Sequence, residues 1–429
     1  MAKPPMDARA VALDLLERVL DKGAQLGEAI DGHPASATLD KRERAFARAI
    51  ATTTLRRLGQ IDALIEHALE RPGTLKSRPV RDILRAGTAQ LLFIGTPAHA
   101  AVDTAVGLAE TRGQGAFKAL VNALLRRIAR EGEAWLAAQD APRLNTPDWL
   151  WRSWEASFGP ERARAIAAAH LEEPPLDLTC KSDADLWATR LGAVRLETGS
   201  LRLEAAGPVA SLAGFAEGAW WVQDAAAALP VRLFGEVRGK RILDLCAAPG
   251  GKTAQLAAAG AEVVAVDRSR RRLRQLETNL SRLGLGAETV AADALTFHTE
   301  ADGILLDVPC TGTGTIRRHP ELPWLRTPGD VRRLAERQAA LLSAAAATLA
   351  PGALLVYSVC SLEAEECATP IEALLEKDAS LARVPLEAAE LGGRDELITP
   401  AGDLRTLPCH LADLGGMDGF YAARLRRSR

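Results

Sequence analysis

The chain has 429 residues, of which 48% are hydrophobic and 25% are charged. This composition is typical of a globular protein with enough apolar residues for several cores. Its 53 basic and 55 acidic residues give a net charge of -2, which excludes a strongly basic wrapper or an acidic solvated chain. At about 150 residues per domain, the length predicts roughly three domains.

The sequence shows no targeting, membrane or disulfide signal. Its start lacks the apolar run of a secretory signal, and no stretch of about 18 consecutive apolar residues follows. The six cysteines form no Cys-x-x-Cys pair, which argues against a zinc site and against a disulfide framework. We therefore expect a cytoplasmic protein with reduced thiols, no metal and no membrane contact. We also expect a monomer.

Residues 1–140 are predicted to be helical nearly throughout. Apolar residues recur every three or four positions, as in Val11, Leu15 and Val19 and again over 40–69. This pattern predicts an all-α domain. Its slight excess of basic residues is consistent with an ordinary solvated helical surface and also with a nucleic-acid surface.

Residues 141–235 are predicted to form a small α+β connecting domain. Thr146 followed by Pro147 is typical of a helix start in which the threonine is the N-cap. Short strand-like runs such as 201–204 follow, separated by glycines.

From residue 236 to 429, strands alternate with helices. Such alternation predicts a Rossmann-like domain with a doubly wound, mostly parallel sheet, which binds ligands outside the carboxyl ends of its strands. The strands are predicted at 241–245, 262–267, 288–293, 303–307 and 353–359, long helices at 268–283 and 330–349, and a hairpin-like close in the tail.

A glycine-rich turn follows the first of these strands. Its small residues let a ligand approach the backbone closely, and the next helix offers free N–H groups. Asp267 and Asp293 end the next two predicted strands, where acids can bind ribose hydroxyls or lie near an adenine ring. One such acid alone is more often a helix N-cap, but acids at successive strand ends favour an adenosyl ligand. The residues of the turn are Cys246, Ala247, Ala248, Pro249, Gly250, Gly251 and Lys252.

Two cysteines follow the fourth and fifth strands, Cys310 and Cys360. If these strands are neighbours, both thiols lie at one end of the sheet. A thiolate that adds to C6 of cytosine makes C5 nucleophilic enough to take a methyl group, and a second group then helps the elimination. The more common alternative for a free cysteine is a small buried core residue, which we expect for the other four.

Three motifs resemble those of the RNA (cytosine-5) methyltransferases with two active-site cysteines. They are Leu-Cys-Ala-Ala-Pro-Gly-Gly-Lys-Thr at 245–253, Asp-Val-Pro-Cys-Thr-Gly-Thr-Gly at 307–314 and Tyr-Ser-Val-Cys-Ser at 357–361. Residues 91–102 and 120–127 resemble the NusB-like RNA-binding domain. A fusion of the two is similar to the bacterial small-subunit ribosomal RNA (cytosine-5) methyltransferases. In this sequence, Thr311 stands where such proteins more often have serine.

The resemblance implies an enzyme that transfers a methyl group from S-adenosylmethionine to C5 of one cytosine in 16S ribosomal RNA. Cys360 would attack C6 and Cys310 would assist release. Asp307 would lie near the cofactor and hydrogen-bond the cytosine edge. The backbone of 246–252, together with Asp267 and Asp293, would hold S-adenosylmethionine.

Basic residues in the loop after the first of the two cysteines are candidates for phosphate contact. They are Arg317, Arg318 and His319.

Other functions stay open at this point. The target could be another RNA such as tRNA, or the chain could be a non-catalytic RNA-binding assembly or antitermination factor. A pure binder would need neither the ligand turn nor the two cysteines. DNA cytosine methylation relies on the Pro-Cys loop alone, so the second thiol favours RNA.

Overall fold

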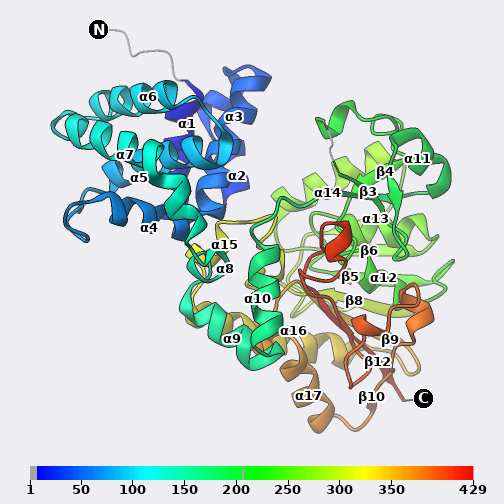
Figure 1. The fold of residues 1–429 in the computed structure, drawn as a ribbon. Coiled ribbons are helices and arrows are strands. Elements are labelled where there is room, and N and C mark those ends of the chain that lie inside the picture. The colour runs from blue at the N-terminus through cyan, green and yellow to red at the C-terminus, as the bar shows by residue number, and fades with distance from the viewer. Residues whose placement is uncertain (1–6, 205–206, 429) are drawn as a thin grey trace. The chain divides into compact units, whose positions relative to one another are not determined.

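The computed structural model describes residues 7–204 and 207–428, which form two compact units (Figure 1). The helical unit contains the chain up to Leu171 together with Ile316–Arg326. The second unit contains Glu172–Thr315 and the chain from Thr327 onward. It includes both cysteines for which the sequence predicts a catalytic role, and we call it the catalytic unit. The start of the chain, where no secretory signal is predicted, lies outside the described residues.

The helical unit is built from amphipathic helices around one apolar core. In its first helix the buried side chains include Val11, Leu15 and Val19, as the periodicity predicts. Asp7 caps that helix by accepting a hydrogen bond from the backbone N–H of Ala10. The helices are α1 (Ala8–Leu20), α2 (Leu26–Asp31), α3 (Lys41–Arg56), α4 (Leu58–Ala68), α5 (Arg78–Ala89), α6 (Ala98–Thr111) and α7 (Lys118–Ala137), with a π-helical turn η2 (Gln90–Ile94) after α5.

Three further helices complete this unit before the chain leaves it: α8 (Ala141–Leu144), α9 (Asp148–Phe158) and α10 (Pro160–Ala169). The predicted cap of α9 is wrong by one residue, because Pro147 is the N-cap and Thr146 lies outside the helix. The hydroxyl of Thr146 instead donates to the carbonyl of Pro142, 2.8 Å away.

A small antiparallel sheet of order β2-β3-β1-β4 opens the catalytic unit. The strands are β1 (Leu176–Cys180), β2 (Val194–Arg195), β3 (Leu201–Leu203) and β4 (Trp220–Val222), and α11 (Ala184–Leu191) lies between the first two in sequence. The region 141–235 is thus divided between the two units. The division into domains 1–140, 141–235 and 236–429 stays a prediction.

The central sheet has the order β10-β12-β9-β8-β5-β6-β7, and β11 pairs with β12. β5 pairs in parallel with β6 and β8, β6 with β7, and β8 with β9, whereas β12 runs antiparallel to β9. The predicted doubly wound, mostly parallel fold is therefore confirmed. The strands are β5 (Arg241–Leu245), β6 (Glu262–Val266), β7 (Glu288–Val290), β8 (Gly303–Asp307), β9 (Leu354–Val359), β10 (Leu381–Arg383), β11 (Leu404–Arg405) and β12 (Tyr421–Arg427).

Helices cover both faces of this sheet because its strands are apolar on both sides. Along β5, Leu243 packs in the core with residues of α16 and α17, while Ile242 packs on the other face with residues of α12 and α13. The helices are α12 (Leu229–Arg232), α13 (Gly251–Ala258), α14 (Arg270–Leu283), α16 (Pro328–Thr348) and α17 (Ala368–Lys377); α15 (Leu322–Leu325) belongs to the helical unit.

The third predicted strand is too long. β7 ends at Val290, so Asp293 lies in the turn after the strand rather than at its end. No helix within residues 7–204 and 207–428 has the length and apolar character needed to cross a membrane.

Candidate active site

The two cysteines singled out by the sequence lie side by side. β8 and β9 are parallel neighbours, with Asp307 opposite Ser358 at their carboxyl ends. The loops that leave these strands place the sulfur of Cys310 3.3 Å from the sulfur of Cys360. Both are free thiols. The expected adjacency is therefore observed.

The surroundings of Cys310 disfavour its thiolate form. The hydrogen bond with Cys360, burial and the nearby charge of Glu366 together raise the pKa of the Cys310 thiol well above its ordinary value. Cys310 is thus held as a protonated thiol at neutral pH. A protonated thiol is a hydrogen-bond donor and a poor nucleophile.

Asp307 ends β8 next to the cysteine pair and binds two side chains. Its carboxylate accepts a hydrogen bond of 2.7 Å from the hydroxyl of Ser358 and pairs at 2.7 Å with the ammonium of Lys252. That ammonium also lies 5.0 Å from the ring centre of Phe420. The sequence placed Lys252 only in the ligand turn, and the roles of Ser358 and Phe420 were not predicted at all, because no short motif links them to Asp307.

The predicted ligand turn has a backbone that requires glycine at one position. Gly250 has φ +100°, and a Cβ atom there would lie 2.7 Å from Cγ of Leu276. The helix α13 begins directly after it, at Gly251. The turn therefore presents a helix N-terminus and a close-packed backbone beside the end of β5.

A pocket joins this turn to the ends of β6 and β8. Asp267 is 4% exposed and accepts hydrogen bonds from the backbone N–H groups of Ala248 and Ser269. Asp293 reaches the same pocket from the turn after β7, although it is not at the strand end. The pocket is lined by Cys246, Val266, Asp267, Arg268, Arg272, Ala292, Asp293, Ala294, Pro309, Arg337 and Leu341.

The side chains that line this pocket fit S-adenosylmethionine. Two carboxylates supply acceptors for hydroxyl and amine groups, and Val266, Ala292 and Leu341 supply apolar walls for a flat ring. Cys246 and Pro309 also line the pocket, so the pocket reaches the loop of the 245–253 motif and the loop of the 307–314 motif. Among the described residues, no group of three or more His, Cys, Asp or Glu side chains is arranged to hold a metal ion.

The three predicted phosphate contacts lie in Ile316–Arg326, which packs in the helical unit. The side chain of Arg317 is only 2% exposed, so in this structure it is not presented to a phosphate. Its carbonyl accepts a hydrogen bond of 2.8 Å from Arg56. Arg318 and His319 are exposed and stay candidates.

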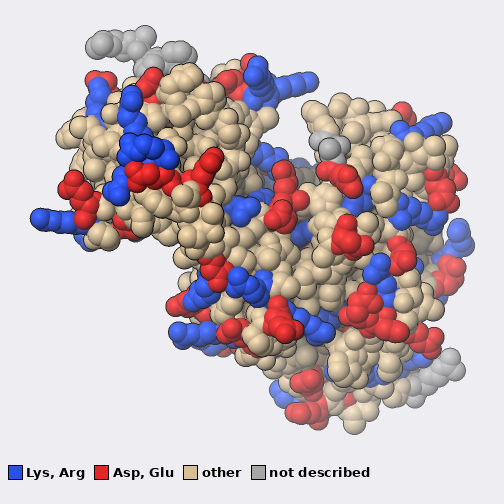
Figure 2. Space-filling model, viewed as in Figure 1, with Lys and Arg blue, Asp and Glu red and all other residues tan. Residues whose placement is uncertain are grey.

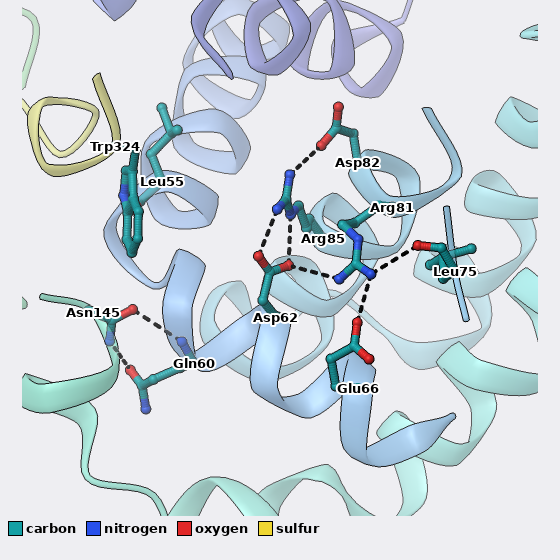
Figure 3. A network of polar contacts seen from close by, with 10 residues as sticks. All are labelled: Leu55, Gln60, Asp62, Glu66, Leu75, Arg81, Asp82, Arg85, Asn145 and Trp324. Atoms are coloured by element: carbon teal, nitrogen blue, oxygen red, sulfur yellow. Dashed lines mark hydrogen bonds and ion pairs between the residues drawn. The ribbon is translucent and has the colours of Figure 1, made fainter. Parts of the chain in front are cut away.

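The anchor of this segment is an aromatic side chain. The indole N–H of Trp324 donates to the carbonyl of Leu55, 2.9 Å away, and the two residues lie side by side in Figure 3. The packing of Ile316–Arg326 in the helical unit was not predicted, because the sequence of a loop does not show which unit the loop packs in.

Residues 233–426 match the family described as 16S rRNA methyltransferase RsmB/F, and residues 6–130 match the NusB family. The chain is 35% identical over its full length to ribosomal RNA small subunit methyltransferase B of Klebsiella pneumoniae subsp. pneumoniae, of which it covers 100%. It is 37% identical to the protein of the same name from Pseudomonas putida, with 98% of each chain covered. The chain belongs to the ribosomal RNA small subunit methyltransferase B family.

Solved structures agree with this fold. The crystal structure of PH0851 is similar over 100% of both chains with a TM-score of 0.77, at 22% identity. A methyltransferase homologue from Pyrococcus horikoshii has a TM-score of 0.54 and 28% identity, covering 64% of this chain and 93% of that one. Family membership confirms the predicted S-adenosylmethionine-dependent methyltransferase and its NusB-like domain.

Proposed function

We propose that this enzyme methylates C5 of a cytosine in small-subunit ribosomal RNA through a covalent bond between Cys360 and C6. The observation that carries the proposal is the pair of thiols, 3.3 Å apart, at the ends of two adjacent strands beside Asp307. A binding protein has no need of such a pair next to an adenosyl pocket. The names of the relatives from Klebsiella and Pseudomonas support ribosomal RNA as the substrate.

The chemistry begins at Cys360. Its thiolate adds to C6, and the electron pair of the C5–C6 bond moves onto C5 and the ring. Asp307 binds the edge of the cytosine. S-adenosylmethionine, when bound, supplies the methyl group that C5 takes up. C5 then loses its proton to water, the C6–sulfur bond breaks, and Cys360 leaves as a thiolate.

Cys310 assists that last step. Because its pKa is raised, chiefly by the hydrogen bond with Cys360, it remains a protonated thiol. Its S–H group lies 3.3 Å from the sulfur of Cys360 and can donate a hydrogen bond to the departing thiolate. Release is therefore expected to be slow without Cys310, while attack on C6 is not.

The target base must be unpaired or flipped out, because C6 is not accessible in a stacked helix. Acidic and basic side chains are interspersed over the face of the molecule seen in Figure 2. We propose that RNA is held by local contacts such as those of Arg318 and His319, together with the NusB-like domain.

The test is methyl transfer from labelled S-adenosylmethionine to small-subunit ribosomal RNA, with 5-methylcytosine identified by nucleoside mass spectrometry. Cys360→Ala is expected to lower the rate by at least about 10³-fold, since it removes the nucleophile. Binding of S-adenosylmethionine should stay within about twofold, because the thiol does not line the adenosyl pocket.

Cys180→Ala is the matched control. Cys180 is another free, half-buried cysteine, but it lies on β1 of the small sheet. Normal turnover by Cys360→Ala, or a methylated base other than cytosine, would contradict the proposal.

A further inference from the structure

A buried carboxylate connects the two cysteine loops. Glu366 ends a short 3-10 turn, η6 (Ala364–Glu366), and is 0% exposed. Its Oε2 atom accepts a hydrogen bond of 2.6 Å from the hydroxyl of Ser361 and another from the hydroxyl of Thr311. Since Thr311 directly follows Cys310 and Ser361 directly follows Cys360, one oxygen atom bridges the two residues next to the thiols.

The second oxygen of Glu366 strengthens the same connection. Oε1 accepts from the backbone N–H of Thr311 at 2.9 Å and from the side-chain amide of Gln338 at 3.0 Å. That amide also donates to the carbonyl of Pro309, which immediately precedes Cys310. The Cys310 loop is thus held on both sides of its thiol by Glu366 and its partner.

Glu366 is itself fixed in place. The hydroxyl of Tyr357, on β9, donates to the backbone carbonyl of Glu366 at 2.7 Å. The side chains of Thr311, Ser361 and Gln338 are all fully buried. In a fully buried site, a carboxylate with four donors is a rigid connection, because each bond that breaks leaves a buried polar group without a partner.

We propose that Glu366 is a positioning residue for methyl transfer, which holds the thiols of Cys310 and Cys360 at their working separation by connecting the two loops that carry them. This inference rests on the proposed roles of the two cysteines. It adds a residue that lies in neither cysteine motif and does not line the adenosyl pocket. The side chain of Glu366 instead bonds to the residues that follow the two cysteines.

The charge of Glu366 acts in the same direction as its hydrogen bonds. Together with the bond to Cys360 and burial, it raises the pKa of Cys310. The carboxylate therefore supports both the position and the protonated state of the thiol that assists release.

Two variants separate geometry from charge. In Glu366→Gln, the amide oxygen can occupy the site of Oε1 and keep both N–H donors. The amide nitrogen then faces two hydroxyl groups, which can rotate and accept. Glu366→Ala removes every one of these bonds. The conservative variant should therefore largely retain the loop geometry that the alanine variant loses.

The kinetic readout is a split between kcat and KM. Glu366→Ala is expected to lower kcat by about 100-fold, the scale of a misplacement of about 1 Å at reacting atoms. The KM for S-adenosylmethionine should change by less than about threefold, because the pocket is untouched. Glu366→Gln should stay within about tenfold of the wild-type kcat. The matched control is Glu365→Ala, the exposed neighbour of the same residue type, which should be normal.

A second readout measures the thiol pair without any catalysis. The oxidant diamide takes two electrons and two protons from a thiol pair, which becomes a disulfide with a sulfur–sulfur bond of about 2.05 Å. Sulfur atoms 3.3 Å apart should close this bond quickly in the wild type. Glu366→Ala should slow disulfide formation by at least about tenfold. The measurement is mass spectrometry of the disulfide-linked peptides that carry Cys310 and Cys360.

Cys360→Ala, measured in the same assays, separates the positioning role of Glu366 from the proposed function. If Cys360→Ala is inactive while Glu366→Ala has normal kcat and normal disulfide formation, the positioning role is wrong and the proposed function stands. If Cys360→Ala is active, the proposed function itself fails. Should Glu366→Ala not fold, the double variant Thr311→Val with Ser361→Ala removes both bonds to Oε2 with little change of shape. Normal kcat in that variant would also overturn the inference.

Discussion

Each unit of the molecule contains a cluster of polar side chains around carboxylates, and the two clusters differ in what they connect. In the helical unit, Arg85 binds Asp62 through two bonds of 2.8 and 2.7 Å and Asp82 through a third, as Figure 3 shows. In the catalytic unit, Glu366 binds hydroxyl and amide groups of two loops. The first cluster joins helix α4 to helix α5, whereas the second joins the loops that carry the thiols.

The difference shows which polar contacts affect stability and which affect chemistry. Asp62 has 30% of its side chain exposed, so water can partly replace a lost bond. Glu366 is fully buried, and its partners are adjacent in sequence to the reacting groups. We therefore expect the helical cluster to affect the free energy of folding alone, and the Glu366 cluster to affect both the free energy of folding and the catalytic rate.

The most direct contrast between the two clusters is expected for Asp62→Ala. Loss of the paired bonds to Arg85 should lower the free energy of unfolding of the protein by about 2 kcal/mol, the range for hydrogen bonds between charged groups. The kcat of the folded enzyme should stay within about twofold of the wild type, because the site lies in the other unit. Urea unfolding and single-substrate kinetics measure the two quantities.

Asp103→Ala provides the control for that variant, since Asp103 is an exposed aspartate within α6 of the same unit. It should change neither quantity. A large fall in kcat for Asp62→Ala without loss of stability would erase the distinction between the two clusters.

A further effect on stability concerns pH. Burial raises the pKa of Asp244, on β5, to about 7, although the hydroxyl of Thr253 donates to it at 2.6 Å. The folded state thus keeps a proton that the unfolded state releases near pH 4. Its contribution to stability is present below that pH and is lost as the pH rises to about 7.

Asp244→Asn mimics the protonated form and should remove this dependence. Between pH 4 and 7, the wild type should lose up to about 1.4 kcal/mol per pH unit relative to the variant. Urea unfolding across that range is the measurement. A constant difference between the two proteins would show that Asp244 does not titrate there.

The sequence allowed the catalytic fold to be predicted closely because its strands are short, apolar and bounded by turns. β5 and β8 begin and end where expected, whereas β7 is shorter, since Ala291, Ala292 and Asp293 are residue types that are depleted in strands. The positions of Cys310, Cys360 and Asp307 followed from motifs placed at strand ends.

The remaining site features are set by tertiary packing and have no local signal. Glu366 bonds to Thr311, 55 residues earlier, and nothing near either residue predicts that contact. The burial of Arg317 depends on the packing of 316–326 in the helical unit. The loop was predicted to bind phosphate because it is basic. The sequence does not show which residues surround the loop in the folded protein.

The most direct test of the account is to find which cysteine bonds to RNA. Cys310→Ala should accumulate a denaturation-resistant complex with substrate RNA, because attack on C6 continues while release is slowed. Nuclease and protease digestion followed by mass spectrometry should find a methylated pyrimidine nucleotide on Cys360, and the double variant Cys310→Ala with Cys360→Ala should give no complex. A nucleotide attached to any other residue, or no complex from Cys310→Ala at normal turnover, would contradict the account.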